Sequence, residues 1–463
     1  MNKYFTTFQD IDAYNSFVAS QELPNINVSY IIDSDDVKYY KEHVSLQPFT
    51  MEIVSLPEGI DSISLSFVNY NYTTDGFASH GKYKFSYDEG ETWTNWYEVN
   101  GTNQTFNDEI VLHEGDKISI IGGYGNIVNI FHFFQDRNIP EGGVKINVSG
   151  NVSSLLLGED FYLKTLDEID YEYGTNPWGD PFGPFYQLFD ATDFPVYVLD
   201  ASDLWLPGSG LVPSCYAKMF KSQIYLTTDI PNIYADWLPV RACESMFEGC
   251  TSLTTMPDIY TTILEKGDSL DYMFKGCTSL VTTKPFKIKH MNFNADEYGH
   301  LFLNTFEGCT SLTTAPQFSF TQLEDINMIT LVIGDTFNGC TSLTSCDWNF
   351  NFESIGSVTY LDLHHMFDGC TSLTTSPVIT GSSKQISPNN MFNNCTSLST
   401  IIWTNTALGP EYLGSFTEDI STLPAVGTLV LADSMTQEGW LGVIVPSTWT
   451  IMTWTQYQSQ NNS

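Results

Sequence analysis

The sequence predicts a mainly β protein, in which a small antiparallel β-sandwich domain is followed by a β-solenoid with short helical turns. Residues 49–136 contain segments of alternating apolar and polar residues, such as SISLSFVNY and KYKFSY, and this two-residue period is typical of antiparallel strands. A motif that begins MFEGCTSLTTMP at Met246 then recurs at intervals of 25 to 32 residues. Such a period indicates a solenoid in which each repeat is one supersecondary unit.

Changes in composition along the chain predict five segments. The stretch YEYGTNPWGDPFGPFYQLF is too rich in Gly and Pro for a helix, and it predicts an ordered loop leading into the repeats. The residues after the repeats are apolar and aromatic, which is typical of a solenoid cap, and they end in a tail, 456–463, that we expect to be irregular. The predicted segments are an N-terminal arm (1–48), an Ig-like β-sandwich (49–140), a connecting and entry-cap region (141–210), the repeat solenoid (211–405) and a C-terminal cap (406–463).

Six copies of the motif share four kinds of residue, and their starts lie 27, 32, 31, 30 and 25 residues apart. We assign as structural repeat residues the phenylalanines Phe247, Phe274, Phe306, Phe337, Phe367 and Phe392 and the turn residues Gly249, Gly276, Gly308, Gly339, Gly369 and Asn394. The same assignment covers the cysteines Cys250, Cys277, Cys309, Cys340, Cys370 and Cys395 and the leucines Leu253, Leu280, Leu312, Leu343, Leu373 and Leu398.

Each position of the motif has a physical interpretation. The phenylalanines are expected to stack as an aromatic spine inside the coil. The glycine is expected to end a short helical turn in the left-handed conformation, which the asparagine of the last repeat tolerates best after glycine. The Thr-Ser-Leu-Thr-Thr segment supplies β-branched strand residues, with its leucine pointing inward. The proline that follows, as at Pro257, is expected to end that strand.

The cysteine ladder favours buried free thiols over a metal or redox site. Zinc sites use closely paired ligands such as CxxC, and the sequence has none. Parallel strands hold neighbouring thiols about 4.8 Å apart on parallel vectors, whereas a disulfide requires Cβ atoms about 3.5–4.5 Å apart. Nine cysteines are also an odd number for a disulfide scaffold. We therefore expect the thiols to act as small hydrophobic groups, with no metal and no cofactor.

The charge of the chain excludes several kinds of partner. It has 55 acidic and 18 basic side chains, a formal net charge of -37, and only two arginines, Arg137 and Arg241. Such a chain is repelled by phosphate backbones and by anionic membrane surfaces, so we expect no nucleic-acid partner. No run of 18 apolar residues is present, so we also expect no membrane insertion. The first residues lack the apolar core of a secretory signal.

One motif raises the question of an enzyme. The segment SYDEGETW, from Ser86 to Trp93, fits the S-x-D-x-G-x-T-W Asp-box of sialidases. Sialidases carry several copies and bind the substrate carboxylate with an arginine cluster, whereas this chain has one copy and two arginines. We therefore expect a structural hairpin, in which the aspartate caps a tight turn and the tryptophan packs beneath it. P-loop, GxSxG, HExxH and dinucleotide motifs are absent, so no catalytic residue is assigned.

Weaker candidates are interpreted as structural. LPGSG at Leu206 is expected to be a turn. The adjacent His364 and His365 would face opposite sides of a strand and so could not chelate one ion together, and both are expected to lie in a loop or on a surface. Carboxylates that lack the glycine and glutamate of an EF-hand loop are not assigned to calcium: Asp33, Asp35, Asp36, Asp200 and Asp203. The aromatic residues Trp178, Phe182, Phe185 and Tyr186 form either a binding surface or, as we favour, packing against the cap. The inserts 286–304 and 346–365 are the expected recognition surface.

The repeat FxGCTSLTxxP, with CYAKMF at Cys215 and CESMF at Cys243, resembles the BspA-type leucine-rich repeat over residues 198–450. Three further phrases, FQDIDAYNSF, FSYDEGETWTNW and GTLVLADSMTQEGW, are similar to segments of structural proteins of gut Bacteroides phages, including the crAss-like group. The resemblance implies a virion component of a tail, a fibre or a capsid decoration. The same repeat also occurs in secreted bacterial adhesins.

These observations together predict a non-enzymatic virion protein, attached to a tail or a capsid, that displays its leucine-rich-repeat solenoid for host-surface adhesion. Repeated copies on one particle would raise avidity without a tight single site. The expected partners are other virion proteins and a host-surface glycan or protein, and the chain is expected to be a homo-oligomer in the particle. A purely architectural virion subunit and a bacterial cell-surface adhesin are the alternatives.

Overall fold

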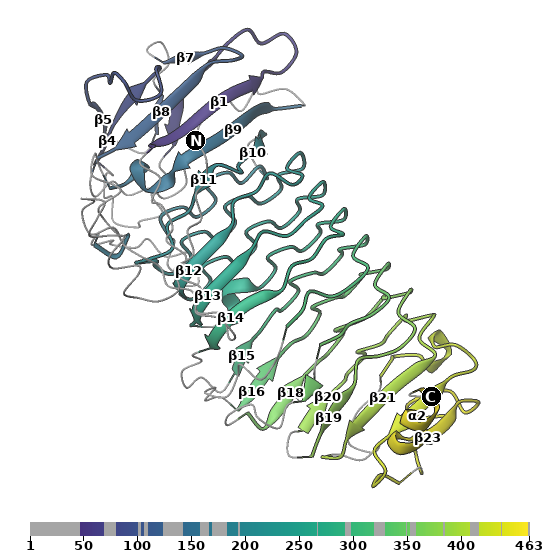
Figure 1. Cartoon of the computed structure of the whole chain (residues 1–463). Coiled ribbons are helices and arrows are strands. Elements are labelled where there is room, and N and C mark those ends of the chain that lie inside the picture. Colours follow the sequence, from purple (N-terminus) through teal and green to yellow (C-terminus); the bar gives the residue numbers. More distant parts are fainter. Residues whose placement is uncertain are drawn as a thin grey trace. The chain divides into compact units, whose positions relative to one another are not determined.

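A computed structural model describes residues 47–68, 80–100, 103–105, 110–123, 142–157, 166–168, 183–192, 195–265, 267–291, 298–318, 329–348, 350–351, 358–382, 385–407, 416–436 and 438–461. The chain divides into two compact units, Met1–Met246 with Pro257–Leu264 and Phe247–Met256 with Glu265–Ser463, and each is described by itself. Both are mainly β and contain several sheets, as the sequence predicts (Figure 1). The predicted arm, 1–48, lies outside the described residues up to residue 46.

The main sheet of the first unit has the strand order β10-β9-β1-β8-β4-β5, with β11 beside β9. Strands β10 and β11 run parallel to β9, and the other pairs are antiparallel. Alternate residues of β1 are buried, among them Phe49, Met51 and Ile53. The strands are β1 (Phe49–Ser55), β4 (His80–Ser86), β5 (Tyr97–Asn100), β8 (Lys117–Gly122), β9 (Val144–Asn151), β10 (Val196–Asp200) and β11 (Leu204–Trp205). The sheet therefore joins strands of the predicted sandwich region to strands of the predicted connecting region.

Smaller elements complete the first unit. Two antiparallel pairs are formed by β2 (Ile63–Ser64) with β7 (Val111–Leu112) and by β3 (Ser66–Val68) with β6 (Asn103–Thr105). The parallel pair β12 (Ile233–Leu238) and β13 (Ile259–Leu264) follows, and the 3-10 helices are η1 (Val152–Leu155) and η3 (Leu166–Glu168).

The first unit also contains rows of tight turns that bond to one another. The amide of Phe185 donates to the carbonyl of Cys215 at 3.1 Å, and the amide of Tyr216 donates to that of Ala242 at 2.8 Å. The rings of Phe185 and Tyr216 stack, with centroids 6.0 Å apart and planes at 7°. Residues 183–192 are therefore a turn row of the same type as the later ones, which the sequence analysis missed.

Among the described residues of the second unit, the strands of successive repeats pair in parallel (Figure 1). One sheet has the order β15-β16-β18-β20, and the other has the order β17-β19-β21-β22-β23. The strands are β14 (Phe286–Met291), β15 (Tyr298–His300), β16 (Thr330–Val332), β17 (Phe350–Asn351), β18 (Tyr360–Asp362), β19 (Ile379–Gly381), β20 (Gln385–Ser387), β21 (Thr400–Asn405), β22 (Thr428–Leu431) and β23 (Thr450–Thr453). The helices are η4 (Gly267–Leu270), η6 (Ile420–Thr422) and α2 (Trp454–Asn461).

The predicted aromatic spine is present in the second unit. The six repeat phenylalanines are fully buried, and the centroids of successive rings lie 5.5 to 5.8 Å apart with planes 3° to 14° from parallel. Phe416 ends the row with its ring edge-on to Phe392 at 5.7 Å. The six repeat leucines and six repeat cysteines are also buried, so the inward positions of the motif are confirmed.

The segment before each repeat glycine is not the predicted helical turn but a run of tight turns of alternating hand. The residue two places before each phenylalanine has a positive φ, for example 58° at Tyr272 and 53° at Asp335. An α-helix requires consecutive right-handed residues, so each such residue interrupts it. The freed amides bond to the next repeat, as Gly276 does to the carbonyl of Glu307 at 2.7 Å. The left-handed glycines are confirmed, with φ of 73° to 75°, and Asn394 has a φ of 57°.

Two predictions about the strand of the motif are wrong. The Thr-Ser-Leu-Thr-Thr segment forms a turn and then a single bridge residue, such as Thr255 paired with Thr282. The proline does not end a strand, because Pro285 directly precedes β14 and Pro377 stands just before β19. Proline is tolerated at the entry of a strand, where its missing N–H costs no ladder bond.

The tail is helical rather than irregular, because α2 continues to Asn461. Thr453 and Gln456 bond reciprocally at its start. The amide of Thr453 donates to Oε1 of Gln456 at 2.9 Å, and the amide of Gln456 donates to Oγ1 of Thr453 at 3.3 Å. This is a capping box, which satisfies two amides that a helix start leaves without intrahelical partners.

Candidate functional site

The cysteine ladder makes a contact that the sequence analysis did not predict. The thiol of Cys277 donates to the carbonyl of Phe247 at 3.1 Å, and that of Cys309 donates to the carbonyl of Phe274 at 3.1 Å. The cysteines of the next three repeats bond in the same way at 3.0 to 3.2 Å. Burial raises the pKa of these thiols, so they stay protonated and keep the hydrogen that they donate. All nine cysteines are free and buried, which confirms the prediction made for the six cysteines of the ladder.

An irregular copy of the motif begins at Met219 in the first unit, and Gln223 stands there where the later repeats have the cysteine. Its side-chain amide donates to the carbonyl of Phe189, and its Oε1 accepts from the amide of Val198 at 2.6 Å. The side chain is fully buried. The position therefore demands a donor toward the preceding phenylalanine carbonyl, which either a thiol or a carboxamide supplies.

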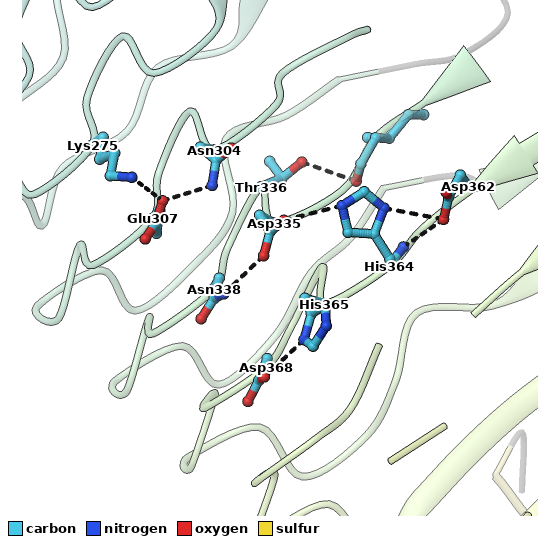
Figure 2. Close-up of polar contacts among 11 residues, drawn as sticks. Lys275, Asn304, Glu307, Asp335, Thr336, Asn338, Asp362, His364, His365 and Asp368 are labelled. Carbon is cyan, nitrogen blue, oxygen red and sulfur yellow. Dashed lines mark hydrogen bonds and ion pairs between the residues drawn. The ribbon is translucent and has the colours of Figure 1, made fainter. Parts of the chain in front are cut away.

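The turns of the second unit carry a ladder of polar side chains, which we call the turn-edge ladder (Figure 2). Within a repeat, a residue and its neighbour three places on are bonded: Asn304 with Glu307 at 2.6 Å, Asp335 with Asn338 at 2.8 Å and His365 with Asp368 at 2.9 Å. Between repeats, Nζ of Lys275 lies 2.6 Å from Oε2 of Glu307. Asp368 also accepts from Asn393 and Asn394 of the following repeat, each at 3.1 Å.

His364 connects two repeats of the turn-edge ladder through both nitrogens of its ring. Its Nε2 lies 3.1 Å from Oδ2 of Asp335 in the preceding repeat, and its Nδ1 lies 3.1 Å from Oδ1 of Asp362 in its own repeat (Figure 2). These hydrogen bonds, first with Asp335 and then with Asp362, raise the pKa of His364 to about 10. The imidazolium therefore bridges two repeats as a fixed cation. Although burial opposes it, the bonds from His364 and Asn338 lower the pKa of Asp335.

Gly334 provides the space for this imidazole. A Cβ at Gly334 would stand 2.3 Å from Cε1 of His364, which is too close for any side chain. The glycine is therefore required by its neighbour in the next repeat.

A second histidine–carboxylate pair lies earlier in the same unit. Nδ1 of His300 is 3.6 Å from Oδ2 of Asp271, and Oδ1 of Asp271 accepts from the amide of Leu303 at 2.9 Å. Burial raises the pKa of Asp271 to about 6, and donation from the imidazole to the Asp271 carboxylate raises the pKa of His300. The two side chains join residues of adjacent repeats in the same manner as His364 does.

The predicted histidines are thus placed in turns, but they are not solitary surface residues. His364 and His365 lie after β18, and their rings are 6.1 Å apart and nearly perpendicular, so they do not face one ligand together. No group of three or more histidines, cysteines and carboxylates among the described residues has a geometry that could hold a metal ion.

The threonine that follows each repeat cysteine forms a second regular row. The hydroxyl of Thr278 donates to the carbonyl of Thr251 at 3.3 Å, and Thr310 and Thr341 repeat the contact at 3.3 Å. Thr371 continues it at 3.2 Å. Each hydroxyl hydrogen is directed to the preceding repeat, so the oxygens form a regular row of acceptors along this edge.

The Asp-box is a self-contained hairpin turn. Oδ1 of Asp88 accepts from the hydroxyl of Ser86 at 2.6 Å and from the amide of Thr92 at 2.8 Å. The hydroxyl of Thr92 donates to the other oxygen at 2.5 Å, and Nε1 of Trp93 donates to the carbonyl of Gly90 at 3.0 Å. The hydrogen bonds from Ser86 and then Thr92 lower the pKa of Asp88 to about 2. The Asp88 carboxylate thus accepts its hydrogen bonds from residues of its own turn, as the sequence predicts for a structural hairpin.

The remaining predicted positions are placed as follows. Phe185 is fully buried against Tyr216, which agrees with the packing interpretation, and Tyr186 accepts from Nζ of Lys218 at 3.0 Å. LPGSG is in irregular backbone after β11, and Asp200 accepts from the amide of Ser202 at 2.8 Å. Trp178, Phe182, Asp33, Asp35 and Asp36 lie outside the described residues.

The second predicted insert contributes to the core. Trp348 is 3% exposed, and its ring lies 5.2 Å from that of Phe337 in the spine. Its Nε1 donates to the carbonyl of Pro316. The start of the insert 346–365 therefore fills the interior between repeats, and its role in recognition stays a prediction.

Comparisons with protein-family models, with curated proteins and with solved structures find no match to this chain. Among the described residues, no helix has the length and apolar character needed to cross a membrane.

Proposed function

We propose that the repeats form a leucine-rich-repeat β-solenoid of the BspA type, preceded by a small β-sandwich, and that the chain is a non-enzymatic virion protein. The observation that carries the solenoid part of this proposal is the register of the repeats, whereas the virion role rests on the similarity of three sequence phrases to phage structural proteins. Phenylalanines, leucines and cysteines are buried in columns, and successive repeats pair in parallel. Such a stack presents the same side chain at a regular spacing along its edge.

A scaffold of this kind suits display rather than chemistry. The polar groups of the turn-edge ladder bond to one another across repeats, as His364 does with Asp335 and Asp362. The carboxylate of Asp88, in the motif shared with sialidases, is engaged in its own hairpin. We propose that the repeat edges carry the adhesive surface, attached to a tail or a capsid through the rest of the chain.

The charge supports a choice among targets. With a net charge of -37, the protein is repelled by anionic polymers, so the proposed target is a neutral host-surface glycan or a host protein. High net charge also keeps a densely displayed protein soluble. The proposed partners within the particle are other virion proteins and further copies of this chain.

Two measurements test the proposal. Mass spectrometry of purified phage particles should find the chain, and its absence from the particles would exclude any virion role. Purified protein should then adsorb to host cells and compete with phage for adsorption. If the chain is in the particle but neither adsorbs nor competes, the architectural role replaces adhesion. If it is found on bacterial cells that carry no phage, the adhesin role replaces both.

A further inference from the structure

Within the described part of the second unit, no strand pairs with the outer side of β23. Strand β23 is the last in the order β17-β19-β21-β22-β23. The amide of Thr450 donates to the carbonyl of Gly427 on the β22 side at 2.9 Å. In a parallel ladder, alternate residues bond to the same neighbour, so Thr450 and Met452 bond toward β22. The N–H and C=O of Ile451 therefore point away from the sheet.

The helix that follows covers only the last residue of this edge, where Oε1 of Gln456 accepts from the amide of Thr453 at 2.9 Å. The amide of Thr455, in the first turn of α2, donates to Oδ1 of Asp433 at 3.0 Å, and Asp433 lies just after β22. Helix α2 is thus tied back toward β22, and none of its residues is buried. An open edge strand is a template for pairing with another strand.

The same segment exposes apolar side chains. Val426 is 77% exposed and Val443 is 61% exposed, the two highest values among the large apolar side chains of the described residues. Leu441 is 39% exposed. Exposed apolar residues in the segment that flanks β22 and β23 in the sequence favour burial against a partner.

The low charge of this segment favours a second copy of the chain as its partner. Residues 424–463 contain two charged side chains, Asp433 and Glu438, among 40 residues, whereas 16% of the whole chain is charged. Two copies that meet through this end would bring together their charge-poor faces. Contact through the rest of so acidic a chain would bring like charges together, which is unfavourable.

We propose that this end binds a second copy of the chain, with β23 pairing antiparallel to β23 of the other copy about a two-fold axis at Ile451. In such a pair, the two Ile451 residues would exchange both of their N–H···O bonds. A two-fold interface is the commonest in homo-oligomers, because the same patch serves both subunits. This dimer contact would be one surface of the homo-oligomer proposed above, and its formation does not depend on a virion role.

The test uses the full chain in solution. Sedimentation equilibrium should show a dimer, and Val443→Lys should weaken its dissociation constant at least tenfold by placing a charge in the contact. Val281→Lys is the matched control, since Val281 is 47% exposed in an earlier repeat, and it should leave the dimer unchanged. Near-identical melting curves of the two variants would show that both are folded.

A cross-link tests the strand pairing itself. Directly opposed residues of a hydrogen-bonded antiparallel pair have Cα atoms about 5.5 Å apart, so an Ile451→Cys variant should give a covalent dimer with a short bismaleimide. Val281→Cys should not, and the nine native cysteines are buried. A wild-type monomer at tens of micromolar would overturn the proposal. A dimer that survives Val443→Lys and gives no cross-link at position 451 would also overturn it, because it would use another surface.

Discussion

Replacing His364 with glutamine should destabilise the second unit at neutral and acidic pH and have little effect at alkaline pH. The imidazolium makes two hydrogen bonds of 3.1 Å, to Asp335 and to Asp362. A hydrogen bond to a charged group contributes about 1.5–3 kcal/mol. The His364 side chain is 31% exposed, so solvent screening reduces the total, and we expect a loss of about 2 kcal/mol.

The direction of the pH dependence follows from the pKa. The pKa of the His364 imidazole is raised from 6.5 in the unfolded chain to about 10 in the folded one. The stabilisation is therefore fully present below pH 6.5, and it is lost as the pH rises from there through 10. Two further histidines are coupled electrostatically to this site, His300 to His364 and His365 to Asp335, and the substitution leaves both in place.

Urea unfolding of the wild type and of His364→Gln, measured at pH 6, 8 and 10.5, gives the difference in unfolding free energy. The expected difference is about 2 kcal/mol at pH 6 and less than about 0.5 kcal/mol at pH 10.5. His113→Gln, in the first unit, is the control and should change neither value. A difference that stays constant across this range would refute the bridging cation, because a neutral imidazole has no pH-dependent contribution there.

Three further outcomes are expected. Gly334→Ala should destabilise the protein because its Cβ would meet the His364 ring. In a His364→Ala background the same change should cost at least about 1 kcal/mol less, and a double-mutant cycle measured by urea unfolding would show this difference. Phe337→Ala should cost about 3–5 kcal/mol through the cavity left in the spine, and a loss below 1 kcal/mol by the same assay would contradict stacking. Asn394→Ala should cost about 1–2 kcal/mol, because alanine is strained at a φ of 57° and the hydrogen bond to Asp368 is lost, and an unchanged melting temperature would contradict that backbone.

Local features of the repeats could be predicted from the sequence because each depends on one residue type. A glycine column followed by asparagine indicates a left-handed turn whatever surrounds it, and Gly339 and Asn394 adopt it. Apolar residues that recur in register, such as Phe337 and Leu343, have to share one interior. The Asp-box could be assigned to a hairpin because the hydrogen-bond partners of its aspartate lie within the same eight residues of sequence.

Features that depend on the spacing between repeats could not be predicted. The partner of His364 is Asp335, which is contributed by the preceding repeat, and only the three-dimensional stack brings the two to 3.1 Å. The same holds for the thiol bonds, which reach a carbonyl in the repeat before. The turn row at 183–192 was detectable, because FYQLF places aromatics four residues apart as YAKMF does at Tyr216. The capping box of α2 was also present in the sequence as Thr453 and Gln456.

Thiol reactivity of the native protein tests the stacked repeats most directly. Each repeat cysteine from Cys277 to Cys395 is buried and donates to the phenylalanine carbonyl of the repeat before, so all of them depend on the stack. Native protein mixed with a water-soluble thiol reagent should show slow modification of fewer than one of its nine cysteines, and unfolded protein should show all nine. Rapid modification of most of the nine in the native state would contradict the stack.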